Sequence, residues 1–118
     1  MLSDTLEEIA RRLPAFRGAA VVGLDGMPLA RLAAAGGPDL DLFAAEGATL
    51  LKQVFGSGSQ AEAGQLRVLM TVGERWHLLL GRVTDEYFLL LVVESDVPVG
   101  QARYELDRAT PRILAEIG

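Results

Sequence analysis

The residues whose surroundings could suggest catalysis are His77 and the serines of Gly56-Ser57-Gly58-Ser59, and the chain contains no cysteine. His77 lies in the apolar context Trp76-His77-Leu78, which is typical of a strand residue rather than a general base. The serine segment lacks the Gly-x-Ser-x-Gly spacing of a nucleophile elbow and follows a predicted helix instead of a strand. It also lacks the Lys-Ser or Lys-Thr pair that ends a phosphate-binding loop. We therefore predict no catalytic residue, and we interpret 56–59 as a helix end and loop.

Two carboxylates stand two residues apart at Asp39 and Asp41, which is the spacing of the first two ligands in a calcium-binding loop. The glycine and the terminal glutamate of such a loop do not follow at the required offsets. Aspartate is also a preferred residue at a helix N-terminus, where its side-chain oxygen accepts backbone N–H groups. We predict that one of the two caps a helix, and we expect no metal and no cofactor.

Composition narrows the classes of partner. The chain has 118 residues, a formal net charge of -5 and a hydrophobic fraction of 50%. The length suits a single domain, residues 1–118, and so high an apolar fraction in so small a chain favours self-association. Arg11-Arg12 is the only adjacent basic pair, so we expect no nucleic-acid partner. The longest apolar run, Phe88 to Val93, is too short to span a bilayer, and the acidic N-terminal segment is unlike a signal peptide. We expect a cytoplasmic protein without membrane insertion.

A hairpin is the clearest local prediction. The apolar run 19–24 leads into Asp25-Gly26, and a second short run leaves it at 27–32. Asp-Gly between two apolar runs is typical of a two-residue type I′ turn, in which both central residues have positive φ. We therefore predict two antiparallel strands joined by such a turn.

The remaining elements follow from apolar periodicity and from prolines and glycines at the ends of segments. The predicted order is a helix at 3–13 that Ser3 caps and Pro14 ends, strands at 19–24 and 27–32, a helix from Asp39 or Asp41 to about Phe55, strands at 66–72, 75–83 and 87–94, and a helix from Asp96 or Pro98 that Pro111 interrupts or restarts. The run Phe88 to Val93 shows no alternation of apolar and polar residues. This predicts a central strand with helices packed on both faces of the sheet.

The segment Gly-Ala-Ala-Val-Val-Gly-Leu-Asp-Gly-Met-Pro-Leu-Ala, residues 18–30, and the order of elements resemble the Roadblock and dynein light chain family, in particular its bacterial MglB-like members. The resemblance implies an α+β sandwich with a five-stranded antiparallel sheet of profilin-like topology. The first and last helices would cover one face and the middle helix the other. It also implies a homodimer that pairs edge strands and packs its middle helices together. Such dimers bind small Ras-like GTPases of the MglA kind, as scaffolds or as GTPase-activating partners.

The middle helix is unusually thin at its centre, where alanines surround Gly47. Glycine in a helix interior is unfavourable relative to alanine, so its presence indicates that another backbone or side chain approaches closely. That neighbour is either the chain's own sheet or the middle helix of a second copy, and both can hold. In the profilin-like order the strand 66–72 is an edge, long and apolar, which favours pairing with its own copy. The predicted dimer interface comprises Ala44, Gly47, Ala48 and Leu51 on the helix and Leu66, Val68 and Met70 on the strand.

The helix face opposite the apolar stripe is the predicted partner-binding site. The stripe that we expect to be buried comprises Leu40, Phe43, Gly47, Leu50, Leu51 and Val54. By analogy with related GTPase regulators, the candidates on the outward face are Glu46, Thr49, Lys52, Gln53 and Phe55. The alternative is a solvated helix face without a partner. Trp76 is either a binding anchor or a sheet-packing residue.

Three functions remain open at this point, and none of them is an enzyme. The resemblance favours a homodimeric GTPase regulator or scaffold. A dimeric signalling adaptor without a GTPase partner is the second. A small-molecule sensor domain is the third, since profilin-like sheets resemble ligand-sensing folds. The predicted core of leucine and valine offers few inward polar groups to orient a ligand.

Overall fold

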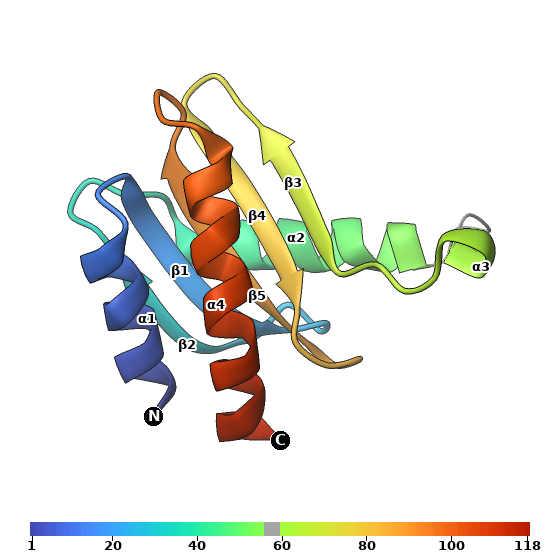
Figure 1. The fold of residues 1–118 in the computed structure, drawn as a ribbon. Helices are drawn as coiled ribbons and strands as arrows, with labels where there is room; N and C mark the ends of the chain where they lie inside the picture. Colours follow the sequence, from blue (N-terminus) through green and yellow to red (C-terminus); the bar gives the residue numbers. More distant parts are fainter. Residues whose placement is uncertain (56–59) are drawn as a thin grey trace.

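Five antiparallel strands form one sheet in the order β2-β1-β5-β4-β3, with helices packed against both faces (Figure 1). The structure, a computed structural model, describes residues 1–55 and 60–118, and the helix end and loop predicted at 56–59 lie outside it. The elements are α1 (Leu2–Arg12), β1 (Phe16–Gly23), β2 (Pro28–Ala33), α2 (Leu40–Phe55), α3 (Gln60–Ala63), β3 (Val68–Val72), β4 (Trp76–Arg82), β5 (Tyr87–Glu94) and α4 (Val99–Ile117). The predicted order is confirmed, with the short α3 added.

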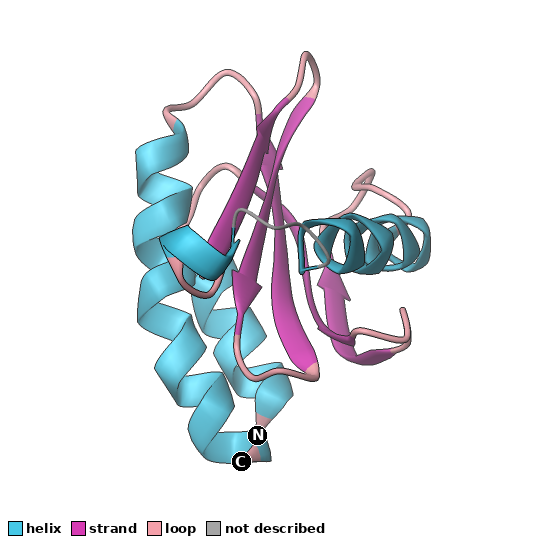
Figure 2. Cartoon of the chain, turned by 90° about the vertical axis from the view of Figure 1, so that its right-hand side faces the viewer, coloured by secondary structure: helices cyan, strands magenta, loops and turns pink. Residues whose placement is uncertain are grey.

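The sheet separates two hydrophobic cores. Helices α1 and α4 cover one face and α2 lies on the opposite face (Figure 2). The central strand β5 serves both, since Leu89 and Leu91 are buried beneath α1 and α4 while Phe88 and Leu90 are buried beneath α2. A strand covered on both faces needs apolar side chains on both, which is why its sequence does not alternate. The prediction of a central strand is confirmed.

The turn between β1 and β2 differs from the predicted type I′ turn. Gly26 has φ +87°, and no non-glycine residue in 1–55 or 60–118 has positive φ, so Asp25 does not adopt the second left-handed conformation. The Gly26 N–H donates to the Gly23 carbonyl at 2.9 Å, and the Gly23 N–H donates to the Met27 carbonyl at 3.0 Å. These bonds define a three-residue loop, Leu24 to Gly26, that ends in a left-handed glycine. The Asp25 carboxylate accepts the Met27 N–H at 3.0 Å and so closes the loop from its side chain.

Two helices also differ from the sequence predictions. Helix α1 begins at Leu2 without a side-chain cap, so Ser3 lies inside it and is not the N-cap. Helix α4 begins after Pro98 and runs unbroken through Pro111, which neither interrupts nor restarts it. Proline removes one N–H from the helix, and an exposed position lets water solvate the carbonyl that loses its partner. The Thr110 hydroxyl donates to the Leu106 carbonyl at 2.8 Å in the same turn.

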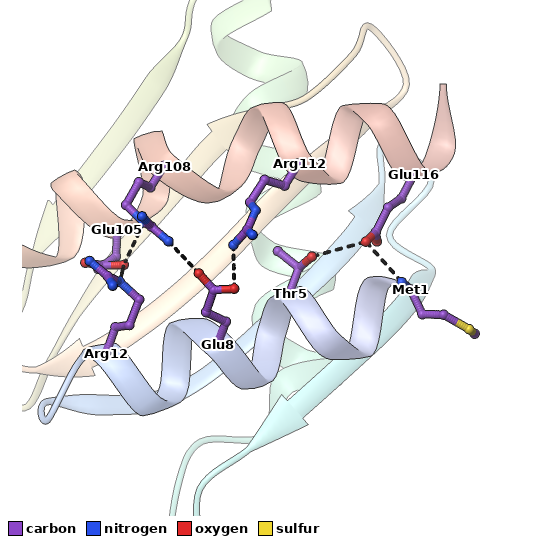
Figure 3. A network of polar contacts seen from close by, with 8 residues as sticks. All are labelled: Met1, Thr5, Glu8, Arg12, Glu105, Arg108, Arg112 and Glu116. Carbon is purple, nitrogen blue, oxygen red and sulfur yellow. Dashed lines mark hydrogen bonds and ion pairs between the residues drawn. The ribbon is translucent and has the colours of Figure 1, made fainter.

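Ion pairs join α1 to α4 along their exposed side (Figure 3). The Glu8 carboxylate forms ion pairs with both Arg108 and Arg112. Arg12 Nε donates a hydrogen bond to Glu105 Oε1 at 3.0 Å. At the other end of α1, Glu116 accepts from the chain's amino group at 3.1 Å and from the Thr5 hydroxyl at 3.3 Å. The network holds two helices that are distant in sequence side by side over one face of the sheet.

The Glu8 carboxylate makes the pairing of α1 and α4 dependent on pH. Its hydrogen bond from Arg112 and the neighbouring Arg108 lower its pKa below the ordinary 4.5. A group whose pKa is lowered by folding contributes stability above its unfolded pKa, and this contribution is lost as the pH falls through the folded value. We expect Glu8→Gln to lower the midpoint of thermal unfolding at pH 7, with the difference from wild type disappearing in acid. Thermal scans across a pH series measure this. Glu7→Gln, the same change one residue away on the exposed side of α1, is the control, and an equal loss in both variants would contradict the expectation.

Candidate protein-docking face

Helix α2 is held at its start by Asp39. The Asp39 carboxylate accepts the backbone N–H of Asp41 at 3.1 Å and that of Leu42 at 3.2 Å, so Asp39 is the capping residue. Asp41 instead pairs with Arg31 of β2 and ties the first turn of α2 to the edge of the sheet. The two aspartates therefore have separate structural roles, and each contributes to fixing α2 on its face of the sheet.

The inner face of α2 packs on its own sheet. Ala44, Ala48 and Leu51 are buried in the hydrophobic core between α2 and the sheet. A Cβ on Gly47 would lie 3.2 Å from Leu80 Cδ2 and 3.3 Å from Phe88 Cε2, which is tighter than ordinary packing. The small residues therefore let the helix approach the chain's own sheet, which is one of the two neighbours considered for the thin centre.

This packing revises two features of the predicted α2. Ala44, Gly47, Ala48 and Leu51 are buried within the single chain, where they leave little surface for a second helix. Leu50, which we expected to be buried, is 36% exposed. It lies next to Leu51 and therefore about 100° around the helix, outside the strip that the sheet covers.

The outer face of α2 carries the predicted partner-binding residues. Glu46, Thr49, Lys52 and Gln53 are all exposed, while the side chain of Phe55 lies outside the described part of the structure. Leu42, which the sequence analysis did not select, is 53% exposed on the same helix. A shallow hollow of about 420 Å³ along this face is lined by Ala45, Glu46, Thr49, Leu50 and Gln53. The outer face thus combines polar side chains with exposed leucines.

A second hollow, of about 530 Å³, separates α2 from the β1–β2 loop and the start of β2. Thr49 lines both hollows, and Lys52, Met27 and Arg31 line the second one. The loop lies close to the helix, because a Cβ on Gly26 would be 3.6 Å from the Ala45 Cα. The outer side of α2 and this loop together form the docking face.

Met27 and Leu29 are the functional candidates that the sequence analysis missed. Met27 is 66% exposed and Leu29 is 50% exposed. The sequence places them only in the hairpin. Exposure in β2 alternates along the strand, because successive side chains point to opposite faces of the sheet. The signal in the sequence was the two-residue period of a strand, which puts Leu29 on the same face of β2 as Arg31. Arg31 is the residue that reaches α2.

Strand β3 is an edge of the sheet, as predicted, although it begins at Val68 rather than at residue 66. It pairs with β4 and with no other strand in the described residues. Leu66 and Val68 pack against opposite cores, and Met70 and Val72 are 41% and 73% exposed. The predicted dimer residues therefore separate into a buried group on α2 and a partly exposed group at this edge.

His77 and Trp76 are neighbours at the start of β4. His77 is 6% exposed within β4, and its Nδ1 has no hydrogen-bond partner among the described residues. Trp76 packs edge-on against Phe43 of α2, with ring centroids 6.0 Å apart, and the Arg75 guanidinium carbon lies 4.5 Å from the centroid of the indole ring. Trp76 thus joins α2 to the sheet. Within 1–55 and 60–118, every helix is too short or too polar to span a membrane.

These elements define an α+β fold in which a profilin-like antiparallel sheet lies between a helix pair and a separate middle helix. The chain belongs to the Roadblock/LC7 domain family, whose sequence model matches residues 2–94, from α1 to the end of β5. A comparison with curated proteins gave no match.

Solved structures agree with this assignment. Gliding protein MglB from Thermus thermophilus and an MglB described with a tetrameric arrangement each share 22% identity with this chain at a TM-score of 0.84, over 96% of this chain and 85% of theirs. Profilin II from Acanthamoeba castellanii shares 18% identity at a TM-score of 0.61, over 92% of this chain and 94% of its own. The expected profilin-like fold and the resemblance to bacterial MglB are confirmed.

Proposed function

We propose that this chain is a homodimeric, non-catalytic regulator or scaffold that binds a small Ras-like GTPase of the MglA kind in the cytoplasm. The observation that carries the proposal is the division of α2 into two faces. Its inner residues are buried against the sheet. On its outer face Glu46, Thr49, Lys52 and Gln53 are exposed beside two hollows. A rigid helix with a mixed polar and apolar surface is a suitable base for a protein interface.

Dimerisation would complete the docking face. The unpaired edge of β3 is a template for a second strand, and pairing of two copies would extend the sheet. A twofold axis at this edge would bring the C-terminal halves of two α2 helices near each other (Figure 1), with Leu50 as an exposed apolar contact. The MglB that is described with a tetrameric arrangement supports self-association in this family.

Regulation would act through the bound GTPase. Stimulated hydrolysis can come from an inserted arginine or from repositioning of the GTPase's own residues. Lys52 is the one cation among the predicted partner-binding residues, and Arg31, the arginine that lines the second hollow, is paired with Asp41. We therefore propose that this chain holds the GTPase in an active arrangement through contacts and supplies no reacting group.

The identity of the partner is tested with the purified chain as bait in its native lysate, with GTP- and GDP-loaded conditions in parallel. A Ras-like GTPase that is retained in a nucleotide-dependent way supports the proposal, and its hydrolysis rate with and without the chain then measures activation. Kinase or structural partners alone, retained equally in both conditions, would instead favour the signalling adaptor. Retention of no protein in either condition contradicts both.

The position of the docking face is tested by Thr49→Arg. Thr49 lines both hollows, so a longer, charged side chain there should obstruct a partner across the whole face. We expect the affinity for the GTPase to fall at least about tenfold, which corresponds to about 1.4 kcal/mol. Gln101→Arg, which introduces the same side chain at an exposed position of α4, should leave the affinity unchanged. Equal losses in both variants would move the interface away from α2.

A further inference from the structure

A separate cleft of about 800 Å³ lies at the β3 edge of the sheet. There the segment between α3 and β3 passes the end of β4 and the first half of α4. Its described lining comes from α2, α3, the β3 edge, the end of β4 and α4, and includes Val54, Leu66, Arg67, Val68, Arg82 and Arg103. Three of these residues are arginines from separate segments, and none is acidic. This is unexpected in a chain with a net charge of -5.

Two of the arginines are oriented by carboxylates outside the described lining. Arg82 pairs through Nη2 with Asp85, and Arg103 pairs through Nε with Asp107 at 2.9 Å. A guanidinium group has five N–H donors, so each arginine keeps donors that these pairs do not use. The two pairs leave part of each guanidinium available to a ligand.

The third arginine forms no ion pair with the described residues and lies opposite a like charge. Arg67 is exposed and forms no ion pair with any described residue. Its carbonyl accepts the Arg82 N–H at 2.8 Å, so the two residues face each other one step beyond the Val68–Gly81 pair of the β3–β4 ladder. Like charges at directly opposite strand positions are destabilising. Asp85 pairs with Arg82 alone, so an anion that contacts both guanidinium groups would reduce the repulsion that remains.

We propose that this cleft binds a small molecule that carries phosphate. Arginine is suited to phosphate because its planar donors can hold two oxygens at once, and several guanidinium groups can share one compact group of oxygens. The volume of the cleft is within the range of small-ligand sites. Val54, Leu66 and Val68 supply an apolar wall beside the arginines, which would accommodate an organic group attached to the phosphate.

The site is independent of the proposed docking face, because no described residue lines both the cleft and either hollow of that face. Failure of one proposal therefore leaves the other standing. A ligand in the cleft would contact the start of β3 and the end of α2 together, and these are the two elements through which we propose dimerisation.

Calorimetric titration of the purified chain with inorganic pyrophosphate, ADP and adenosine tests the proposal. We expect pyrophosphate and ADP to bind and adenosine not to bind. Tighter binding of ADP than of pyrophosphate would identify a nucleotide-like ligand that uses the apolar wall, and equal binding would identify the phosphate group alone as the ligand. Absence of binding by both phosphate compounds overturns the proposal.

Arg67→Gln is the diagnostic variant, with Arg11→Gln as its matched control on the exposed surface of α1. Because the Arg67 side chain forms no ion pair with the described residues, the variant should fold, and thermal unfolding verifies this. We expect Arg67→Gln to weaken pyrophosphate binding about tenfold or more, as loss of a charge-assisted contact does. Arg11→Gln should leave it unchanged. Equal weakening by the control would show attraction by general charge and would overturn the assignment of the cleft.

Discussion

Replacing Gly47 with leucine should destabilise the folded chain by about 3 kcal/mol, because it overfills the core beneath α2. A Cβ alone would already lie 3.2 Å from Leu80 and 3.3 Å from Phe88, and both of these side chains are buried. The three further carbons of leucine would force the helix away from the sheet or the core side chains out of their rotamers. Denaturant unfolding measures the loss as a lower midpoint with little change in slope.

The control for Gly47→Leu is Gly100→Leu. Gly100 is also helical, but it lies in the first turn of α4, and a Cβ there would meet no atom within 4 Å. We expect that variant to be neutral or slightly stabilising, since leucine is the better helix former. Measurement at several protein concentrations separates the two neighbours considered for Gly47. A loss that is independent of concentration indicates packing within one chain, whereas a loss confined to high concentration would restore the helix–helix contact.

The architecture was predictable from the sequence where residue patterns have one physical explanation. The unbroken apolar run 88–93 requires cover on both faces of a sheet, and the structure places it at the centre of five strands. The aspartate before α2 has a preferred role at a helix N-terminus, and Asp39 fulfils it. In both cases the local pattern and the tertiary structure impose the same requirement.

Other features were not predictable because one local sequence pattern is compatible with more than one structure. A glycine between alanines indicates close approach, whether the neighbour is a sheet or another helix, and only the contacts of Gly47 with Leu80 and Phe88 distinguish them. A proline in a helical pattern suggests a break, but α4 continues because Pro111 is on the exposed side. An Asp-Gly pair suggests a two-residue turn, but the Asp25 side chain supports a three-residue loop.

The docking face was predictable only in part for a related reason. The exposed polar residues of α2 follow from helical periodicity, which a sequence contains. Met27 joins them because the β1–β2 loop folds back against Ala45, and Arg67 meets Arg82 because of the register between β3 and β4. These neighbours are set by the tertiary fold and not by spacing along the chain.

Replacing Met70 with lysine should convert the proposed dimer to monomers at micromolar concentration. Met70 is at the centre of β3 and is 41% exposed at an edge that has no second strand neighbour in the described structure. A twofold pairing of β3 with its copy would place the two Met70 side chains close together near the axis, so the variant would bring two ammonium groups together there. We expect the dimer dissociation constant to rise about 100-fold, or about 2.7 kcal/mol, in sedimentation equilibrium.

Leu29→Lys is the matched control, because it introduces the same charge at a 50% exposed apolar residue on the other edge strand, β2. If β3 is the dimer edge, this variant keeps the dissociation constant of the wild type, and both variants keep its unfolding midpoint measured as monomers. Dissociation caused by Leu29→Lys instead would assign the dimer to β2. Because β2 borders the docking face through Arg31 and Asp41, that result would also place the second copy where we propose that the GTPase binds. The pair of variants therefore tests whether the second copy pairs with β3 or with β2, the opposite edge of the sheet.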